Sequence, residues 1–96
     1  MANLSSAPVV VDRTLYPVEV KIVVGPHPAT LDIVRDGEKL NIAKVMLPGS
    51  TQVFYAKDNI VLSTNNGGST RVILNDKDLG PLGKEGQPVK NQRFGK

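Results

Sequence analysis

The chain has 96 residues, which suffices for one domain with a modest hydrophobic core but not for two. Hydrophobic residues make up 40% and charged residues 22% of the sequence, a balance that fits an ordinary globular domain and excludes wholesale disorder. The sequence contains no cysteine, which excludes disulfides, thiolate catalysis and cysteine-based zinc sites. No apolar run approaches the roughly 18 residues of a membrane-spanning helix, and no signal peptide is evident.

The net charge of +3 is concentrated at one end of the chain. Residues 1–83 carry eight basic and eight acidic side chains, and the whole surplus comes from residues 84–96, with four basic and one acidic. Aromatic residues make up only 4% of the sequence, so few rings are available for stacking on bases or sugars. Because nucleic-acid binding requires basic residues clustered on a folded face, we expect a solvated basic tail and no nucleic-acid partner.

The sequence predicts a flexible lead-in over residues 1–14 and one folded domain over residues 15–96. The first strand is expected within residues 16–24, where valines and Ile22 alternate with Glu19 and Lys21 in the period-two pattern of a half-buried strand. A second alternation covers residues 29–35. The pair Asp36-Gly37 then predicts a tight hairpin into a strand over residues 38–45.

The rest of the chain continues as short strands separated by turns. Turns are expected at residues 47–50 and 57–59, and strands at residues 51–56, 60–63, 70–74 and 89–94. No segment keeps a 3.6-residue period, so little or no helix is expected. About seven antiparallel strands spaced near ten residues apart predict an all-β fold, an immunoglobulin-like β-sandwich.

No catalytic or metal-binding constellation is recognisable. His27, the one histidine, stands between two prolines in a turn, and no spacing connects it with Ser5, Ser50, Ser63 or Ser69 as a nucleophile, so an exposed turn histidine is the simpler interpretation. The run of residues 75–78 holds three oxygen-bearing side chains, but Lys77 interrupts it and a hairpin turn is favoured over a calcium loop. We therefore predict no catalytic residues, no metal and no cofactor.

Five glycines, at positions 67, 68, 80, 83 and 86, do not form a phosphate-binding loop. Such a loop requires a following helix whose N-terminal amides face the phosphate, and here the first cluster precedes a strand and the second precedes a segment broken by proline. Lys84 is accordingly interpreted as a surface charge.

The most informative segment is residues 65–88, which read N-N-G-G-S-T-R-V-I-L-N-D-K-D-L-G-P-L-G-K-E-G-Q-P. One short apolar strand lies there between two glycine-rich turns. This order resembles the C-terminal domain of the RodZ family of bacterial cell-shape proteins, in which N-x-G-G-x-x-x-V-x-L-N is followed by L-G-P-L-G-K-x-G. Two positions differ: Thr30 or Leu31 stands where the family commonly has tryptophan, and Asp76 replaces a glycine, which suggests a longer or differently shaped turn.

The resemblance implies a non-enzymatic, extracytoplasmic interaction domain that acts in cell-shape determination and wall elongation. In that family a linker and one transmembrane helix join the domain to a cytoplasmic helix-turn-helix domain that engages the actin-like protein MreB. The chain would then belong to a longer single-pass membrane protein, anchored through a helix outside this sequence, with protein partners in the wall-elongation machinery. The candidate interaction surface consists of Leu79, Gly80, Pro81, Leu82, Gly83, Lys84 and Gly86, with Leu82 expected to be exposed.

One alternative is a stand-alone immunoglobulin-like binding module that serves adhesion or attachment to envelope polysaccharide. The scarcity of aromatic residues disfavours sugar stacking. An enzyme is the third possibility, disfavoured because the sequence shows no acid–base pair, metal ligands or nucleophile motif. The oligomeric state and the identity of the partner are left open.

Overall fold

The structure is a computed structural model that describes residue 12 and residues 14–95, without the side chains of residues 41 and 42. The flexible lead-in predicted for residues 1–14 lies mostly outside the described residues. Where it ends, the backbone N–H groups of Leu15 and Tyr16 donate to the Asp12 carbonyl, so a hydrogen-bonded turn leads into the first strand.

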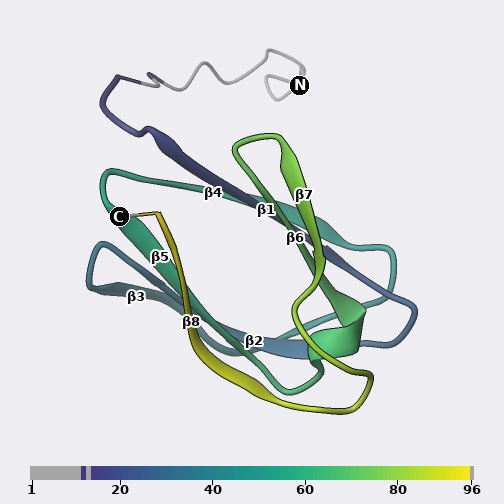
Figure 1. Ribbon diagram of the computed structural model, residues 1–96. Coiled ribbons are helices and arrows are strands. Elements are labelled where there is room, and N and C mark those ends of the chain that lie inside the picture. Colours follow the sequence, from purple (N-terminus) through teal and green to yellow (C-terminus); the bar gives the residue numbers. More distant parts are fainter. Residues whose placement is uncertain (1–11, 13, 96) are drawn as a thin grey trace, which may run out of the picture.

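Eight strands form two antiparallel sheets that pack face to face (Figure 1). The strands are β1 (Val18–Val24), β2 (Ala29–Arg35), β3 (Glu38–Met46), β4 (Thr51–Ala56), β5 (Asn59–Thr64), β6 (Thr70–Leu74), β7 (Lys77–Pro81) and β8 (Val89–Gly95). One sheet has the order β4-β1-β6-β7 and the other the order β3-β2-β5-β8. The predicted all-β sandwich of antiparallel strands is confirmed.

The chain changes sheet after β1, β3, β4, β5 and β7, and stays in one sheet only through the hairpins β2–β3 and β6–β7. Helical structure in the described residues is limited to the 3₁₀ turn η2 (Gly67–Ser69). The strand count exceeds the predicted seven because β7 was expected to be a turn. Its residues are exposed apart from a half-buried Gly80, so the sequence carries no buried alternation there.

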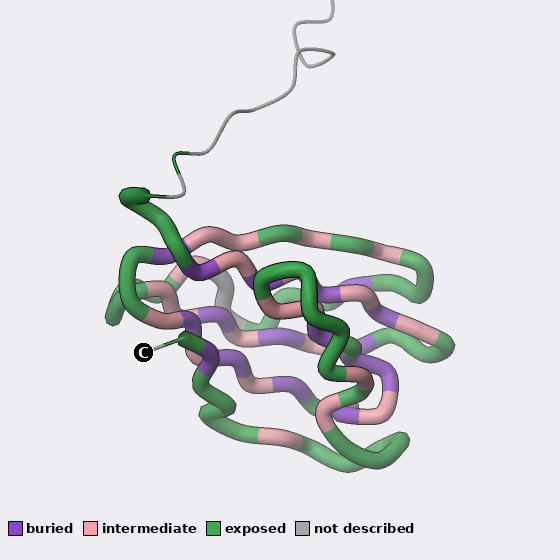
Figure 2. Tube along the Cα trace, turned by 45° about the horizontal axis from the view of Figure 1, so that its top comes forward, coloured by how far each residue is buried: buried purple, intermediate pink, exposed green. Residues whose placement is uncertain are grey.

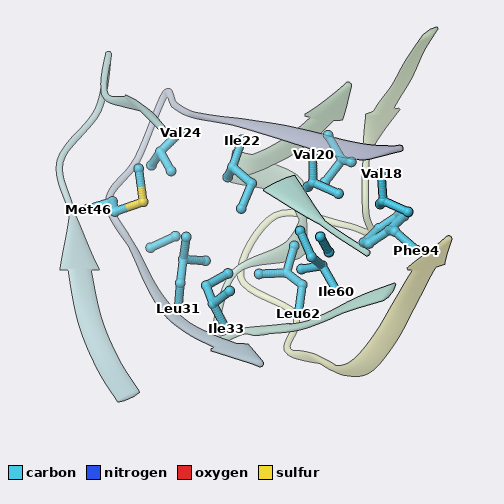
Figure 3. Close-up of a cluster of buried hydrophobic side chains, with 13 residues drawn as sticks. Val18, Val20, Ile22, Val24, Leu31, Ile33, Met46, Ile60, Leu62 and Phe94 are labelled. Carbon is cyan, nitrogen blue, oxygen red and sulfur yellow. The ribbon is translucent and has the colours of Figure 1, made fainter. Parts of the chain in front are cut away.

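The core lies between the sheets and is mostly aliphatic (Figure 3). In β1 every second residue is buried, as the alternation predicts, and in β2 Ala29, Leu31 and Ile33 face inward in the same way. Figure 2 shows this alternation of buried and half-buried positions along the central strands. The buried hydrophobic residues are Val18, Val20, Ile22, Val24, Ala29, Leu31, Ile33, Met46, Ala56, Ile60, Leu62, Val72 and Phe94.

The β6–β7 turn is tighter than the sequence suggested. Asn75 and Asp76 both adopt positive φ, 48° and 68°, and Leu74 pairs directly with Lys77. Asp76 therefore takes the left-handed conformation that glycine adopts most easily, which short polar side chains also tolerate. The Asn75 side chain accepts a 2.8 Å hydrogen bond from the Glu19 N–H, which fixes the turn against β1. Of the two expectations, a longer or a differently shaped turn, the longer turn was wrong, because only Asn75 and Asp76 separate the paired residues.

The basic C-terminal segment was expected to combine a strand over residues 89–94 with a solvated tail. The strand is confirmed, and the tail interpretation was wrong for those residues. Residues Val89–Gly95 form β8, which pairs with β5 at the edge of the second sheet. Phe94 is buried in the core, whereas Lys90 and Arg93 are exposed. The positive charge therefore lies along a sheet edge.

Asp36 connects the β2–β3 hairpin to the turn between β4 and β5. Its carboxylate accepts hydrogen bonds of 2.8–3.0 Å from the backbone N–H groups of Lys57, Asp58 and Asn59. Partial burial of this carboxylate opposes ionisation, but the three donors outweigh it and hold the Asp36 pKa below its ordinary value. Asp36 and Gly37 have φ of 49° and 83°, as a two-residue hairpin turn requires.

Replacing Asp36 should separate its role as a hydrogen-bond acceptor from its role as a turn residue with positive φ. Asp36→Gly keeps the turn conformation but removes the acceptor, and should lower the free energy of unfolding by about 1–2 kcal/mol. Asp36→Asn keeps one acceptor oxygen for Asp58 and Asn59 and tolerates positive φ, but it loses the charge and the acceptor for Lys57, so its cost should lie between zero and that of Asp36→Gly. Urea denaturation of the three proteins measures both effects. Equal stability of Asp36→Gly and the unmodified chain would contradict the assigned role.

Candidate functional site

The predicted interaction surface divides into an edge strand and a loop. Leu79, Gly80 and Pro81 belong to β7, at the edge of the first sheet, and Leu79 is 43% exposed. Gly83, Lys84 and Gly86 lie in the exposed loop that leads from β7 to β8. Leu82 was expected to be exposed, and this was wrong: it is half-buried and packs against the core.

This loop is held against η2 by backbone hydrogen bonds. We call residues 66–69 together with residues 82–87 the glycine cradle. Gly67 donates to the Gln87 carbonyl at 2.7 Å, and Gly68 donates to the Lys84 carbonyl at 3.0 Å. In return the Gly67 carbonyl accepts from Leu82 and Gly83 at 3.1 and 3.2 Å. Two segments that lie about 15 residues apart in the sequence are thus joined backbone to backbone, beside each other in Figure 1.

The approach of the two segments explains why glycine occupies positions 67 and 68. A Cβ atom on Gly67 would lie 2.7 Å from a methyl group of Val89 and 3.0 Å from the Gly83 nitrogen. A Cβ atom on Gly68 would overlap the Glu85 backbone, which cannot move without breaking the hydrogen bonds of the cradle. Both glycines are therefore required by space, because a side chain would separate the loop from η2.

Glu85 is the polar centre of the cradle. Its carboxylate accepts a hydrogen bond from the Ser69 hydroxyl, 2.9 Å to Oε1, and its Oε1 lies 3.1 Å from His27 Nδ1. The His27 backbone N–H donates to Ser69 Oγ at 3.1 Å. The β1–β2 turn, η2 and the loop before β8 therefore meet at one carboxylate. The Asn66 side chain completes the contact by accepting from the Gly86 N–H at 2.8 Å.

A serine, a histidine and a carboxylate lie together here, but their connections differ from those of a hydrolase triad. In a triad the histidine lies between the other two and bonds the serine hydroxyl through its ring. Here the carboxylate lies between them, and His27 reaches Ser69 through its backbone. Ser69 is also completely buried. This arrangement can hold three segments together, and it does not present an activated hydroxyl to a substrate.

No sequence signal predicted this cluster. His27 was correctly expected to be exposed in a turn, with 62% of its side chain accessible, but its pairing with Glu85 was missed. The partners are 58 residues apart, so only the folded chain brings them together. Hydrogen bonds from Ser69 and then from His27 stabilise the charged form, and they lower the pKa of the Glu85 carboxyl below its ordinary value.

A pocket of about 460 Å³ lies at the other end of β1. Its lining combines both tyrosines of the chain with two basic and two acidic side chains: Tyr16, Tyr55, Arg35, Lys57, Asp36 and Glu38. Arg35 and Glu38 lie 3.7 Å apart, and the Asp36 carboxylate is occupied by backbone donors. Both tyrosine rings, the kind of surface that contacts a sugar ring, therefore line the same pocket.

Residues 75–78 form a turn and the start of β7, as the hairpin interpretation predicted. The Asp78 carboxylate binds Arg71 Nε at 3.1 Å and the Gly80 N–H at 2.8 Å. Among the described residues, no group of three or more histidine, cysteine, aspartate or glutamate side chains is placed to hold a metal ion. In the same part of the chain, no helix is long and apolar enough to cross a membrane.

Substituting Gly68 tests the close approach in the cradle. Gly68→Ala should lower the free energy of unfolding by about 1–3 kcal/mol, because the added methyl group overlaps backbone that is fixed on both sides. Gly86→Asn is the matched control and should cost less than about 1 kcal/mol, since Gly86 has positive φ but no atom lies within 4 Å of the position that a Cβ would take. Chemical denaturation ranks the two, and a Gly68→Ala protein as stable as Gly86→Asn would contradict the assignment.

The Glu85 contact should make stability depend on pH in a defined direction. Because the folded pKa lies below the ordinary value of 4.5, the carboxylate stabilises the fold above that pH. The stabilisation is lost as the pH falls through the folded pKa. Glu85→Gln should therefore be less stable than the unmodified chain at pH 7, and the difference should shrink in more acidic buffer. Thermal unfolding across this range measures the difference, and a gap that stays constant with pH would contradict the role of the charge.

No family model, curated protein or solved structure matches this chain.

Proposed function

We propose that this domain is a non-enzymatic, extracytoplasmic interaction module of a RodZ-like, membrane-anchored protein that acts in bacterial cell-shape determination and wall elongation. The observation that carries the proposal is the order of the glycine signature in residues 65–88, which resembles the C-terminal domain of that family. The binding function would be exerted by the edge strand β7 and the adjoining loop, which carry the predicted interaction surface.

The geometry of residues 65–88 supports this proposal, because the signature residues allow close backbone contacts or fix turns. Gly67 and Gly68 allow the loop to approach η2, and Asn75 fixes the β6–β7 turn against β1. Asn65 plays a similar part at the other sheet, where its side chain accepts from the Thr30 N–H at 2.8 Å. The residues that carry the resemblance are therefore ones that this fold uses for backbone approach and for fixing turns.

The exposed groups beside these structural residues are the ones able to contact a partner. Leu79 presents an exposed aliphatic side chain on the sheet edge, Pro81 is exposed at the end of the same strand, and Lys84 is exposed in the loop that follows. An exposed apolar residue on the edge strand and a positive charge in the loop after it fit a protein partner that offers an apolar contact and an acidic group. Leu82 contributes to stability, since it packs against the core.

A second candidate is the stand-alone binding module for envelope polysaccharide. The observation that favours it is the pocket in which Tyr16 and Tyr55 lie together. Four charged side chains surround these rings, so the pocket would suit a sugar that carries both carboxylate and amine or amide groups. This site is at the opposite end of β1 from the glycine cradle, so the two candidate functions are separable by substitution.

Charge reversal in the native gene tests the leading proposal. Cells that carry Lys84→Glu together with Leu79→Ser should lose their normal width. The two changes remove the apolar contact that this domain offers its partner and invert the positive charge that follows it in the sequence. Lys90→Glu is the matched control, since it makes the same charge change on β8 in the other sheet. Microscopy gives the cell width, and an immunoblot shows whether each variant accumulates to the same level.

The same cells also test the location. Protease added outside the cytoplasmic membrane should remove this domain from a protein much larger than 10.3 kDa. A domain protected from protease, or normal width in the double variant, would contradict the proposal. Binding to a cell-wall glycan that is lost on replacing Tyr16 or Tyr55 with alanine would favour the second candidate instead.

A further inference from the structure

The two sheets leave four edge strands, β3, β4, β7 and β8. An edge strand exposes a row of backbone N–H and C=O groups that can pair with another strand, and proteins usually block this with charges, proline, bulges or short length. The four edges of this sandwich differ in how far they are blocked.

Three of the four edges carry blocking features. Strand β7 has Lys77, Asp78 and Pro81, and its pairing with β6 shifts register beside Gly80. Strand β8 has Lys90 and Arg93, and its pairing with β5 also shifts register. Strand β3 has charged residues at both ends and two register shifts against β2. Each of these edges is unsuited to pairing along its length.

Strand β4 carries none of these features. Its residues, Thr51–Ala56, read T-Q-V-F-Y-A and include no charge, proline or glycine. All six pair in unbroken register with β1, from Thr51 opposite Val23 to Ala56 opposite Val18. Among the edges in the described part of the chain, β4 is therefore the one that is regular, neutral and unblocked.

The direction of the backbone groups on β4 follows from its neighbours. Val24 exchanges hydrogen bonds with residues 49 and 50 on the β4 side, whereas Glu19 exchanges them with Asn75 on the β6 side. Backbone direction alternates along an antiparallel strand, so Gln52 and Phe54 point toward β1. The N–H and C=O groups of Thr51 and Val53 then point away from the sheet. The Val53 side chain is also 39% exposed.

We propose that β4 pairs with β4 of a second copy of this chain, antiparallel and about a two-fold axis at Val53. In this register Val53 lies opposite Val53 of the other copy, and their outward backbone groups exchange two hydrogen bonds. Two sheets of the order β4-β1-β6-β7 then join into one continuous sheet. A two-fold interface of this kind uses the same surface on both copies.

The sequence of β4 suits a second copy because the strand is uncharged and no like charges meet across the two-fold axis. Phe54 and Gln52 lie on the core side, opposite Val20 and Ile22, whereas Thr51 and Tyr55 lie on the outer side. With Val53 at the axis, Thr51 faces Tyr55 and Gln52 faces Phe54, so core-side residues meet core-side residues and outer residues meet outer residues. No like charges oppose each other, since Lys57 falls opposite Gly49.

The association of the purified chain tests this proposal. Sedimentation velocity from about 10 µM to about 1 mM should show a monomer that converts to a dimer, as expected for the weak affinity of a short edge. Amide hydrogen exchange should show that Thr51 and Val53 become protected as the concentration rises. Gln52 and Phe54, which bond to β1, should be protected at every concentration.

Three substitutions at Val53 isolate the backbone pairing. Val53→Pro removes an outward N–H from each copy and should lower the association constant roughly 30-fold. Val53→Lys places two like charges opposite each other and should abolish the dimer. Val53→Thr keeps the N–H and the branched shape, so it should still dimerise. Protection of Gln52 and Phe54 in each variant shows that the fold is intact.

Three outcomes would overturn the proposal. The first is a monomer over the whole concentration range. The second is a dimer that persists in folded Val53→Pro and Val53→Lys proteins, which would mean that another surface forms it. The third is protection of the Thr51 and Val53 amides in the monomer, which would mean that a segment of the same chain covers β4.

Discussion

The sandwich depends on the close approach of two backbone segments in the glycine cradle. η2 leads the chain from β5 in one sheet to β6 in the other, and the loop after β7 leads it back to β8. Both crossings occur at the same place, and their hydrogen bonds and the Glu85 carboxylate join them to each other and to the β1–β2 turn. The absence of a side chain at Gly67 and Gly68 makes this contact possible.

Period-two patterning was sufficient to predict most strands, because residues buried on one face of a strand leave a local signal. β1 and β2 show this best, and the Asp36-Gly37 hairpin follows from local turn chemistry. β7 was missed since an exposed edge strand with Lys77 and Asp78 has no buried face to reveal it. The strand over residues 89–94 was predicted and is confirmed as β8, but its exposed Lys90 and Arg93 were interpreted as a tail because β8 buries only Phe94, near its end.

The candidate site was predicted less completely than the fold. The sequence placed Leu79 and Lys84 correctly on an accessible surface, but it gave no indication that Leu82 packs against the core. The sequence also did not predict the contact of Glu85 with Ser69 and His27, because this contact joins three separate loops and follows no fixed spacing. Tertiary contacts between turns carry no periodicity, so they must be seen in the folded chain.

Strands β7 and β4 form opposite edges of one sheet, with β1 and β6 between them. At about 4.8 Å between neighbouring strands, the two edges lie about 14 Å apart, so a partner at β7 and a second copy at β4 do not compete for space. Joining two copies through β4 places their β7 edges at the two far ends of a continuous sheet. A dimer of the proposed kind would thus display two partner surfaces at once, and binding at one would raise the effective concentration of the other. Weak association through β4 would then be strengthened wherever partners are themselves arrayed along a surface.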